Sequence, residues 1–263
     1  MNSELLDARE ELGRRIRASE EWENTYRKNP AIFDRLLRSE RRLERHTLVY
    51  LRGLAERAPA LVRWQYMPLH TASDDPLVDD SDRTRQIEAA IFIALVLQDI
   101  ADLYAVGMDG GFEIYQTPVS VDRLTELRLD AARDHVGTLI KDVTVTNLKL
   151  IRKSIETSIA MGESVSDSIN RVQQIIRNPV RAEMIARTEA VNAYQSGLVI
   201  FGYESGAESK TWLAKQAGAC RICAPLDGVT VPLDQAFQTL IGAVLRPTAH
   251  PRCRCDMRLN YPK

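Results

Sequence analysis

Four cysteines and one histidine near the C-terminal end are the residues whose types and spacing point most directly to chemistry. Cys220 and Cys223 stand in GACRICAPLDG, and His250, Cys253 and Cys255 stand in HPRCRC, so the chain keeps all four of its cysteines in these two stretches. Structural zinc sites are tetrahedral and commonly use four cysteines, or three cysteines and one histidine. The pattern predicts a structural zinc site formed by four of these five residues.

Two residues compete for the fourth place in such a site. Cys220, Cys223 and Cys253 fit a ligand set of either kind. His250 and Cys255 are alternatives for the fourth ligand. The spacing of His250 and Cys253 repeats the C-x-x-C spacing of the first pair, so each pair could bind from one tight turn. We therefore expect His250 to be the fourth ligand and Cys255 to be the spare thiol.

The cellular compartment decides between metal binding and disulfides. The first residues, MNSELLDAREELGRR, alternate charges and lack the apolar core of a secretory signal. We therefore expect an intracellular address, where thiols stay reduced and clustered cysteines serve as metal ligands. Paired disulfides remain the alternative use of the four thiols.

Catalytic uses of the cysteine pair require features that the chain lacks. A thioredoxin-like C-x-x-C begins a helix, whereas turn residues such as Asp227 and Gly228 follow this pair. Zinc deaminases add an H-x-E motif and a proline before C-x-x-C, and neither is present. In the ARTE motif, Arg187 and Glu189 lie about 200° apart on a helix, so Glu183 is the expected ion-pair partner of Arg187. We expect no enzymatic activity.

Composition and charge narrow the function classes further. With 263 residues, 44% of them hydrophobic and 27% charged, the chain is expected to fold into one large domain or two to three smaller units. Its 35 Lys and Arg residues balance 36 Asp and Glu residues, which excludes a globally basic nucleic-acid binder but leaves room for a local basic patch.

Apolar periodicity assigns most of the chain to helices. We predict a mainly α protein in which a helical body precedes a small β-containing C-terminal module held by zinc. The expected segments are N-terminal helices (1–57), a Pro- and Asp-rich linker (58–86), a helical body (87–206) and a Cys/His module (207–263). The N-terminal helices carry two apolar faces, one formed by Leu5, Leu12 and Ile16 and one by Leu36, Leu37, Leu43, Leu48, Leu51 and Leu54.

Two stretches have a composition that could suggest a membrane-spanning helix or a calcium-binding loop. The apolar residues 89–107 are interrupted by Gln98, Asp99 and Asp102, which are costly in a bilayer, so we expect a buried helix. Residues 73–82 contain five aspartates but lack the ligand spacing and the turn glycine of a calcium loop. Neither a membrane span nor a calcium site is therefore predicted.

Local signals mark the helix ends in the body. Gly162 is expected to end one helix, Ser164 with Asp167 to begin the next, and Asn178 with Pro179 to begin the one after. The first two helices carry apolar stripes formed by Leu148, Ile151, Ile155 and Ile159, and by Val165, Ile169, Val172 and Ile176.

Glycines carry two further predictions. Gly197 and Gly202 lie inside the last long helix and indicate close packing against another helix. Gly110 and Gly111 are expected to form a turn before an extended piece, FEIYQTPVSV.

The sequence pattern of the C-terminal module predicts short strands, whereas that of the body predicts helices. KTWLAK and GVTVPL are expected to be short strands, with Asp227 and Gly228 in a turn before the second. Asp234 is expected to cap a short helical piece that holds Phe237, and the remaining residues from Arg246 are expected to be irregular and basic.

Three motifs in this order resemble the phage Mu F-like family of minor head proteins, also called phage head morphogenesis proteins. They are ARTEAVNAYQSG, KTWLAKQAGACRICAPLDGVTV and HPRCRC, and the resemblance is specific over residues 181–256. The chain departs from the family where it reads QAGACRIC, since relatives often have an Asp and an Arg-Thr before the C-x-x-C. The family-motif residues outside the ligand set are Arg187, Thr188, Glu189, Trp212, Asp227 and Gly228.

The resemblance implies a structural protein of tailed-phage heads, present in few copies at the portal vertex. Its role would be head assembly, DNA packaging or DNA delivery, without enzymatic activity, and its partners would be the portal protein and other head proteins. The expected location is the virion (head interior or portal vertex), and the host cytoplasm during assembly. No membrane and no small-molecule substrate are expected. A toxin domain, which some relatives carry, is not expected after Cys255.

Two other classes compete with this reading. The alternative is a zinc-ribbon protein that binds nucleic acid or has a regulatory role. The last eighteen residues have a local charge of +4 and could contact phage DNA non-specifically. That charge comes from Arg246, Arg252, Arg254, Arg258 and Lys263 against Asp256. A nuclease or an ADP-ribosyltransferase would require a paired-carboxylate or metal-histidine site, which the sequence does not show.

Overall fold

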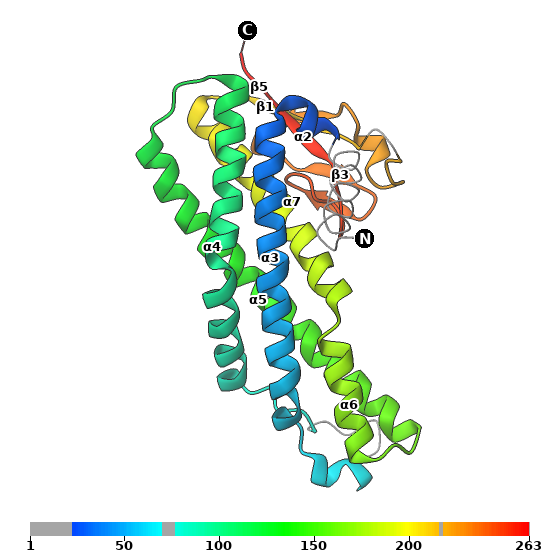
Figure 1. Ribbon diagram of the computed structural model, residues 1–263. Helices are drawn as coiled ribbons and strands as arrows, with labels where there is room; N and C mark the ends of the chain where they lie inside the picture. The colour runs from blue at the N-terminus through cyan, green and yellow to red at the C-terminus, as the bar shows by residue number, and fades with distance from the viewer. Residues whose placement is uncertain (1–22, 70–76, 216–217, 263) are drawn as a thin grey trace, which may run out of the picture. The chain divides into compact units, whose positions relative to one another are not determined.

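The computed structural model describes residues 23–69, 77–215 and 218–262, which are mainly helical (Figure 1). The chain forms two compact units. The cysteine-containing unit comprises the described parts of residues 1–40, 101–130 and 187–263, and the helical unit comprises residues 41–100 and 131–186. These units differ from the four consecutive segments expected from the sequence, because each long helix contributes residues to both. The expected helix with Leu5, Leu12 and Ile16 lies outside the described residues.

The helices have clear limits (Figure 1). They are α2 (Glu23–Lys28), α3 (Pro30–Arg57), α4 (Asp82–Tyr115), α5 (Val121–Ala160), α6 (Val165–Ile176) and α7 (Pro179–Ser205), with short 3-10 helices η1 (Ala58–Leu61), η2 (Trp64–Leu69) and η3 (Ala224–Leu226). The predicted stripe of α3 is confirmed, since Leu36, Leu43 and Leu51 are fully buried.

The predicted helix ends between α5 and α7 are confirmed. Gly162 adopts a left-handed φ of +65°, which glycine tolerates without a steric penalty. The Asp167 N–H donates to Ser164 Oγ at 3.1 Å, as in a capping box. The Val180 N–H donates to Asn178 Oδ1 at 3.0 Å, which caps α7.

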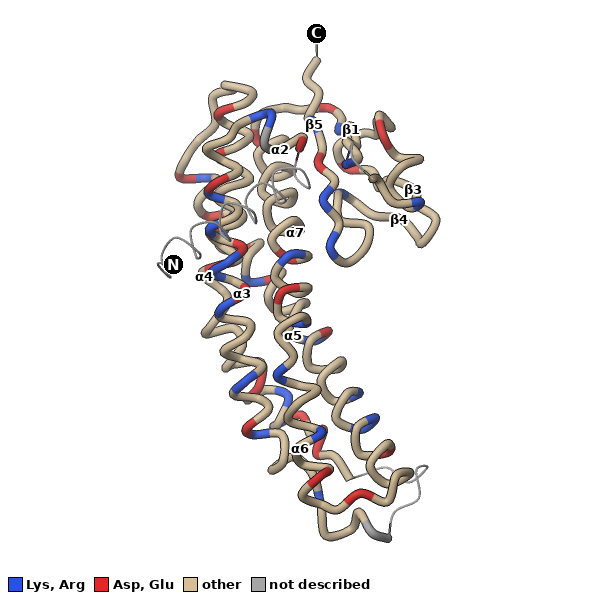
Figure 2. The backbone as a smooth tube through the Cα atoms, turned by 45° about the vertical axis from the view of Figure 1, so that its right-hand side comes forward, with Lys and Arg blue, Asp and Glu red and all other residues tan. Residues whose placement is uncertain are grey.

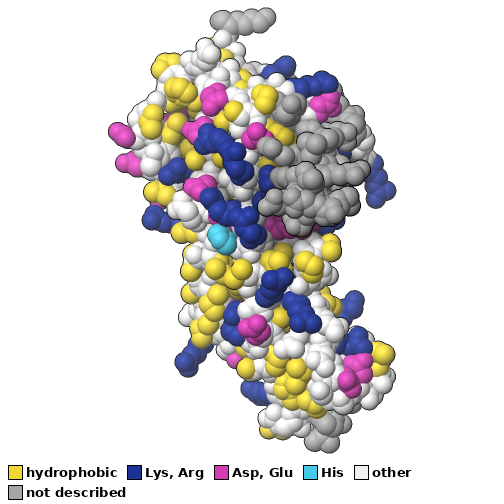
Figure 3. All heavy atoms as spheres, in the orientation of Figure 1, with side chains coloured by type: hydrophobic (Ala, Val, Ile, Leu, Met, Phe, Trp, Pro, Cys, Tyr) yellow, Lys and Arg dark blue, Asp and Glu magenta, His cyan; other side chains and the backbone are white. Residues whose placement is uncertain are grey.

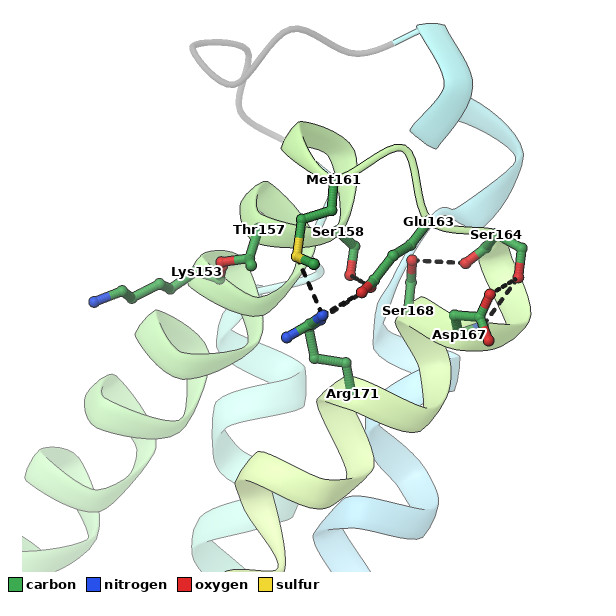
Figure 4. A network of polar contacts seen from close by, with 9 residues as sticks. All are labelled: Lys153, Thr157, Ser158, Met161, Glu163, Ser164, Asp167, Ser168 and Arg171. Carbon is green, nitrogen blue, oxygen red and sulfur yellow. Dashed lines mark hydrogen bonds and ion pairs between the residues drawn. The ribbon is translucent and has the colours of Figure 1, made fainter.

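A polar network fixes the turn between α5 and α6 (Figure 4). Arg171 Nε donates to Glu163 Oε2 at 2.9 Å, and Ser158 Oγ donates to the same oxygen at 2.8 Å. The Arg171 guanidinium, followed by the Ser158 hydroxyl, lowers the pKa of Glu163 to about 2. The contacts tie the end of α5 to α6 through side chains, in addition to the backbone turn.

Helix α4 is the one helix of the described residues that is long and apolar enough to cross a membrane by length and composition. Two of its buried carboxylates, however, have basic partners within the helical unit. Asp99 is 1% exposed and accepts a hydrogen bond from Arg42 Nε at 2.6 Å, while His46 Nδ1 lies 2.5 Å from its other oxygen. Buried Glu88 forms two hydrogen bonds with Arg57, at 2.8 and 2.7 Å. Buried Asp99 and Glu88 are thus paired inside the protein, and 44% of the apolar 18-residue stretch of this helix is buried.

The described residues of the expected linker contain regular structure. Residues 58–69 include η1 and η2, Val62 forms a β-bridge with Val78, and α4 begins at Asp82. The described aspartates of this stretch have structural partners: Asp79 accepts from Thr84 Oγ1 at 2.7 Å, and Asp80 accepts from Arg152 at 2.6 Å. Ser81 Oγ accepts from the Thr84 N–H at 3.4 Å in the first turn of α4, and Asp79 supports this cap by accepting from the Ser81 N–H at 3.0 Å.

The predicted turn at Gly110 and Gly111 is wrong, because α4 continues through both to Tyr115. A Cβ atom on Gly111 would lie 2.5 Å from the Phe201 ring of α7. These glycines therefore permit close helix packing and do not end the helix. The irregular segment is confined to residues 116–120.

The same kind of packing confirms the prediction for Gly197. A Cβ atom there would lie 2.1 Å from the Tyr104 carbonyl oxygen, and one on Gly107 would lie 2.0 Å from the Tyr194 carbonyl oxygen. Helices α4 and α7 of the cysteine-containing unit thus cross with their backbones in contact at two opposed glycines.

The described residues of the cysteine-containing unit include five short strands. They are β1 (Ser209–Leu213), β2 (Thr230–Pro232), β3 (Phe237–Thr239), β4 (Gly242–Val244) and β5 (Asp256–Asn260). An antiparallel sheet has the order β2-β1-β5, and β3 pairs with β4 in a separate hairpin. The sheet packs on α7 through a core of Leu198, Phe201, Leu233, Met257 and Leu259.

Two predictions for this module are wrong. Phe237 lies in β3 and not in a helix, because it packs edge-on against Trp212 at 5.2 Å and pairs with Val244. The C-terminal residues are not wholly irregular, because β5 pairs with β1 in the register Leu213↔Asp256. Buried Met257 and Leu259 stabilise that strand, although polar residues flank them in the sequence.

The two charge signs are mixed over the molecule. Basic and acidic positions are interspersed along the helices in Figure 2, and side chains of both signs share the face drawn in Figure 3. Any anion-binding surface must therefore be local, as the near-zero net charge suggests.

Candidate metal centre

The two cysteine-bearing loops meet because β1 and β5 pair. Cys220 and Cys223 follow β1, and Cys255 directly precedes β5, whose first residue pairs with Leu213 at the end of β1. The second loop also carries His250 and Cys253. The structure thus brings all five predicted ligands to the walls of one cavity.

Each ligand pair sits on its own tight turn. The Cys223 N–H donates to the Cys220 carbonyl at 3.1 Å, and the Cys253 N–H donates to the His250 carbonyl at 3.1 Å. The Asp227 carboxylate accepts from the Ala214 N–H at 2.8 Å, and Gly228 has a φ of +77°, so the predicted turn before β2 is present.

The sulfur and nitrogen atoms lie close together. His250 Nε2 is 3.1 Å from Cys220 Sγ and 3.4 Å from Cys223 Sγ, and Cys223 Sγ is 3.8 Å from Cys253 Sγ. Cys255 joins a second close group with Cys223 and Cys253. Among the described residues, these two overlapping groups are the ones that could hold a metal ion, and all four cysteines are free thiols.

His250 is oriented for ligation. Its Nδ1 lies 2.9 Å from the Pro251 carbonyl oxygen, which can only accept a hydrogen bond. Nδ1 must therefore carry the proton in the neutral ring, and the lone pair of Nε2 faces the two thiols. Burial lowers the pKa of His250, but this carbonyl and the neighbouring cysteines raise it more, so the pKa lies above its ordinary value.

The thiols strongly influence one another. Hydrogen bonds from Cys223 and Cys255 lower the pKa of Cys253, whereas the hydrogen bond that Cys223 shares with Cys253 raises the pKa of Cys223. Burial raises the pKa of Cys220, yet backbone N–H groups of Cys223 and Ile222 lower it more. Several thiolates could therefore coexist here only with a positive charge among them.

The family-motif residues surround this cluster. Trp212 is fully buried against Phe237 in the same apolar core as Cys223, Cys253 and Cys255. Thr188 Oγ1 accepts from the Arg252 N–H at 3.1 Å, and Glu189 accepts from Asn192, whose side-chain oxygen accepts from Thr248 Oγ1 at 2.6 Å. These contacts attach the second ligand loop to α7. The pairing of Arg187 with Glu183 stays a prediction.

Sequence reasoning missed two buried charged groups beside the ligands. Arg254 donates to both oxygens of Glu40, at 3.1 and 2.9 Å. Asp256 is 1% exposed and accepts from Lys28 Nζ at 2.8 Å, from Gln195 Nε2 at 2.7 Å and from Thr25 Oγ1 at 3.0 Å. The expected solvated basic tail is thus wrong for Arg254, whose charge is used internally, and Lys263 lies outside the described residues.

The Asp256 contacts lead to a stability prediction. Asp256→Asn replaces a carboxylate that accepts four hydrogen bonds by an amide and leaves Lys28 without its anionic partner. We expect the free energy of unfolding to fall by about 2 kcal/mol in urea titrations. Asp234→Asn, at an exposed position, is the control and should change it by less than about 0.5 kcal/mol. Equal effects of the two variants would contradict a structural role for Asp256.

Comparison with known proteins agrees with this assembly of motifs. Residues 149–258 match the family model described as Phage Mu protein F like protein. This stretch belongs to the Mu F-like family. No curated protein and no solved structure shows a significant match to the chain. The Mu F-like stretch contains α6, α7, the strands up to the first half of β5 and every candidate ligand, and it suggests a phage head morphogenesis protein.

Proposed function

We propose that the protein is a non-enzymatic minor component of a tailed-phage head, associated with the portal vertex, whose Mu F-like stretch is held by structural zinc. The observation that carries the proposal is the buried cysteine–histidine cluster inside that stretch. Its partners would be the portal protein and other head proteins, in the assembled virion or, before assembly, in the host cytoplasm. Membrane binding and a small-molecule substrate form no part of the proposal.

The donor set favours zinc over other ions. Thiolate and imidazole ligands suit zinc, whereas magnesium and calcium prefer oxygen. With zinc–sulfur bonds of about 2.3 Å, neighbouring sulfurs of a tetrahedral site lie about 3.8 Å apart. The distance of 3.8 Å between Cys223 and Cys253 fits this edge. Zinc would supply a structural crosslink between the two loops, while Cys220, Cys223, Cys253 and His250 would hold it.

The β3–β4 hairpin offers a surface for contact with a head protein. Its two-residue loop consists of Leu240 and Ile241, which are 74% and 59% exposed, and Leu245 after β4 is 53% exposed. Tight hairpin loops normally hold Asn, Asp or Gly, because those residues suit the turn conformation. Adjacent exposed aliphatic side chains at such a loop are expected to become buried against a partner protein.

Particle composition tests this proposal. We expect mass spectrometry to find the protein in purified heads and in complexes with the portal ring. The double variant Leu240→Ser, Ile241→Ser should reduce its amount per particle at least about tenfold, since it removes two anchor side chains. Val145→Ser, at an exposed position of α5, is the control and should leave incorporation unchanged. Detection only in the host cytosol would refute the proposed role.

A further inference from the structure

A small hollow lies between the end of α4 and the first turns of α5, within the cysteine-containing unit (Figure 1). It is separate from the candidate metal ligands and from the β3–β4 hairpin, because all of its lining residues belong to α4 and α5. Its volume of about 180 Å³ is below the range of about 300 to 1,000 Å³ for small-molecule sites. The hollow is therefore suited to one inserted side chain rather than to a free metabolite.

Apolar side chains form most of the lining. Met108 and Leu124 are buried and belong to the core on which the sheet packs. Phe112 and Val121 also line the hollow, yet they are 46% and 70% exposed. Large apolar side chains that stay exposed around a hollow are typical of a surface that contacts another protein.

Two charged residues line the hollow, and their charges differ in compensation. Asp109 Oδ2 accepts a hydrogen bond from Arg35 Nη2 at 2.5 Å, so an opposite charge balances this carboxylate. Arg128 has neither a hydrogen-bond partner nor an ion-pair partner in the part of the chain that the structure describes. Of its side-chain nitrogens only Nε is buried, so the Nη atoms reach solvent.

The position of Arg128 on α5 places its charge beside the hollow. Side chains of a helix lean toward its N-terminus, so each residue covers the turn before its own Cα. The turn before Arg128 contains Leu124 and Thr125, and all three residues line the hollow. Because Nε is buried, the side chain lies against the protein and does not extend freely into solvent. A carboxylate at the mouth of the hollow would therefore meet a positive charge that nothing in the described chain offsets.

We propose that this hollow docks a segment of a partner protein that inserts one large apolar side chain and pairs a neighbouring carboxylate with Arg128. The inserted side chain loses its contact with water against Met108, Phe112 and Leu124, and a single anchor of this kind commonly dominates the energy of an interface. A guanidinium donates paired hydrogen bonds to a carboxylate, which orients the segment, whereas a basic segment is repelled. The inference does not depend on the proposed role at the portal vertex.

Two small probes of the same shape test the chemistry of the hollow. Phenylpropionate carries an aromatic group and a carboxylate, and phenylpropylamine carries the same group and an ammonium. In NMR titrations of the full-length protein at constant ionic strength, both should shift the methyl signals of Met108 and Leu124. The carboxylate should bind about fivefold more tightly than the ammonium. Equal affinities, or methyl signals that neither probe shifts, would contradict the proposal.

Matched variants separate Arg128 from the net charge of the protein. Arg128→Gln should reduce the preference for phenylpropionate to less than about twofold, because the pair with the carboxylate is lost. Arg52→Gln makes the same charge change at an exposed position of α3 outside the hollow, and should leave the preference unchanged. Val121→Ser should weaken both probes alike, since it removes apolar surface and no charge. Equal effects of the two arginine variants would overturn the assignment to Arg128.

A photocrosslinker in the hollow identifies its occupant. Thr125→p-benzoylphenylalanine, at an exposed lining position, is irradiated in cells that assemble heads. We expect a crosslink to a partner segment that has a large apolar residue within four positions of an Asp or Glu, and Arg128→Glu should abolish it. The same crosslinker at Asp142, an exposed position of α5 outside the hollow, should not capture this segment.

The other outcomes of the crosslinking are also decisive. A crosslink to a second copy of this chain, to residues 1–22 of the same chain, or to a segment without a carboxylate would overturn the proposal, as would the absence of any crosslink. If the expected segment is captured but the protein is missing from purified heads, the docking site stands and the role in the head is refuted.

Discussion

Removal of the proposed zinc ion is expected to unfold residues 207–263 while the helices of the helical unit stay folded. The apolar core of the module includes Cys223, Cys253 and Cys255 themselves, and its strands are only three to five residues long. Metal binding in small zinc-finger peptides contributes about 10 to 16 kcal/mol of apparent folding free energy. Without the free energy of metal binding, so small a core is not expected to hold the two loops together.

Spectroscopy distinguishes local from global unfolding. Trp212 is fully buried in the module against Phe237, so chelation should shift its fluorescence to the red. The helical far-ultraviolet circular dichroism should be largely retained, because most helical residues lie outside the module. Loss of the helical signal together with the Trp212 change would contradict independent stability of the helices.

Ligand variants identify the metal-binding set. Cys220→Ser and Cys223→Ser should each abolish stoichiometric zinc, because the first loop offers no other thiol. His250→Ala should do the same, since Nε2 faces both of these sulfurs, whereas Cys255→Ser should retain the metal. The reverse result would make Cys255 the fourth ligand. A metal-free wild-type protein with two disulfides would refute the zinc proposal.

A single methyl group at the crossing of α4 and α7 is expected to cost about 3 kcal/mol of stability or more. Gly197→Ala would place a Cβ atom 2.1 Å from the Tyr104 carbonyl oxygen, and a backbone atom cannot move aside as a side chain can. The two helices would have to separate, which disrupts the packing around Leu198 and Phe201. Urea unfolding, followed by fluorescence and circular dichroism, measures the change.

Gly137→Ala provides the matched control. Gly137 also lies inside a long helix, α5, but a Cβ atom there would meet nothing within 4 Å. Helix propensity then acts alone and should stabilise the protein by up to about 1 kcal/mol. The two variants should therefore have effects of opposite sign. Destabilisation of similar size by both would mean that helix contact is not the reason for Gly197.

Local signals were sufficient for much of the fold. The apolar stripe of α5, its end at Gly162, the cap at Ser164 and the start of α7 at Pro179 were all predictable, because each depends on residues within one or two turns. The two ligand pairs were also recognisable, since a tight turn needs only the spacing of its own residues. The family followed from the order of these motifs.

Tertiary contacts decided what those signals could not. Gly110 and Gly111 look like a turn, but the packing of α7 against α4 keeps them helical. The strand β5 is stabilised by pairing with β1, more than forty residues earlier in the chain.

The surroundings of the site likewise depend on distant residues. From the sequence, Arg254 is part of a basic tail. In the structure it is buried and donates to Glu40, 214 positions away in the chain. Asp256 accepts from Thr25 across 231 positions. The sequence by itself determined the candidate ligand pairs and most helix ends, because both depend on near neighbours along the chain. Only the fold decided which charges are buried and which are paired, because burial and pairing depend on residues that meet solely in the folded protein.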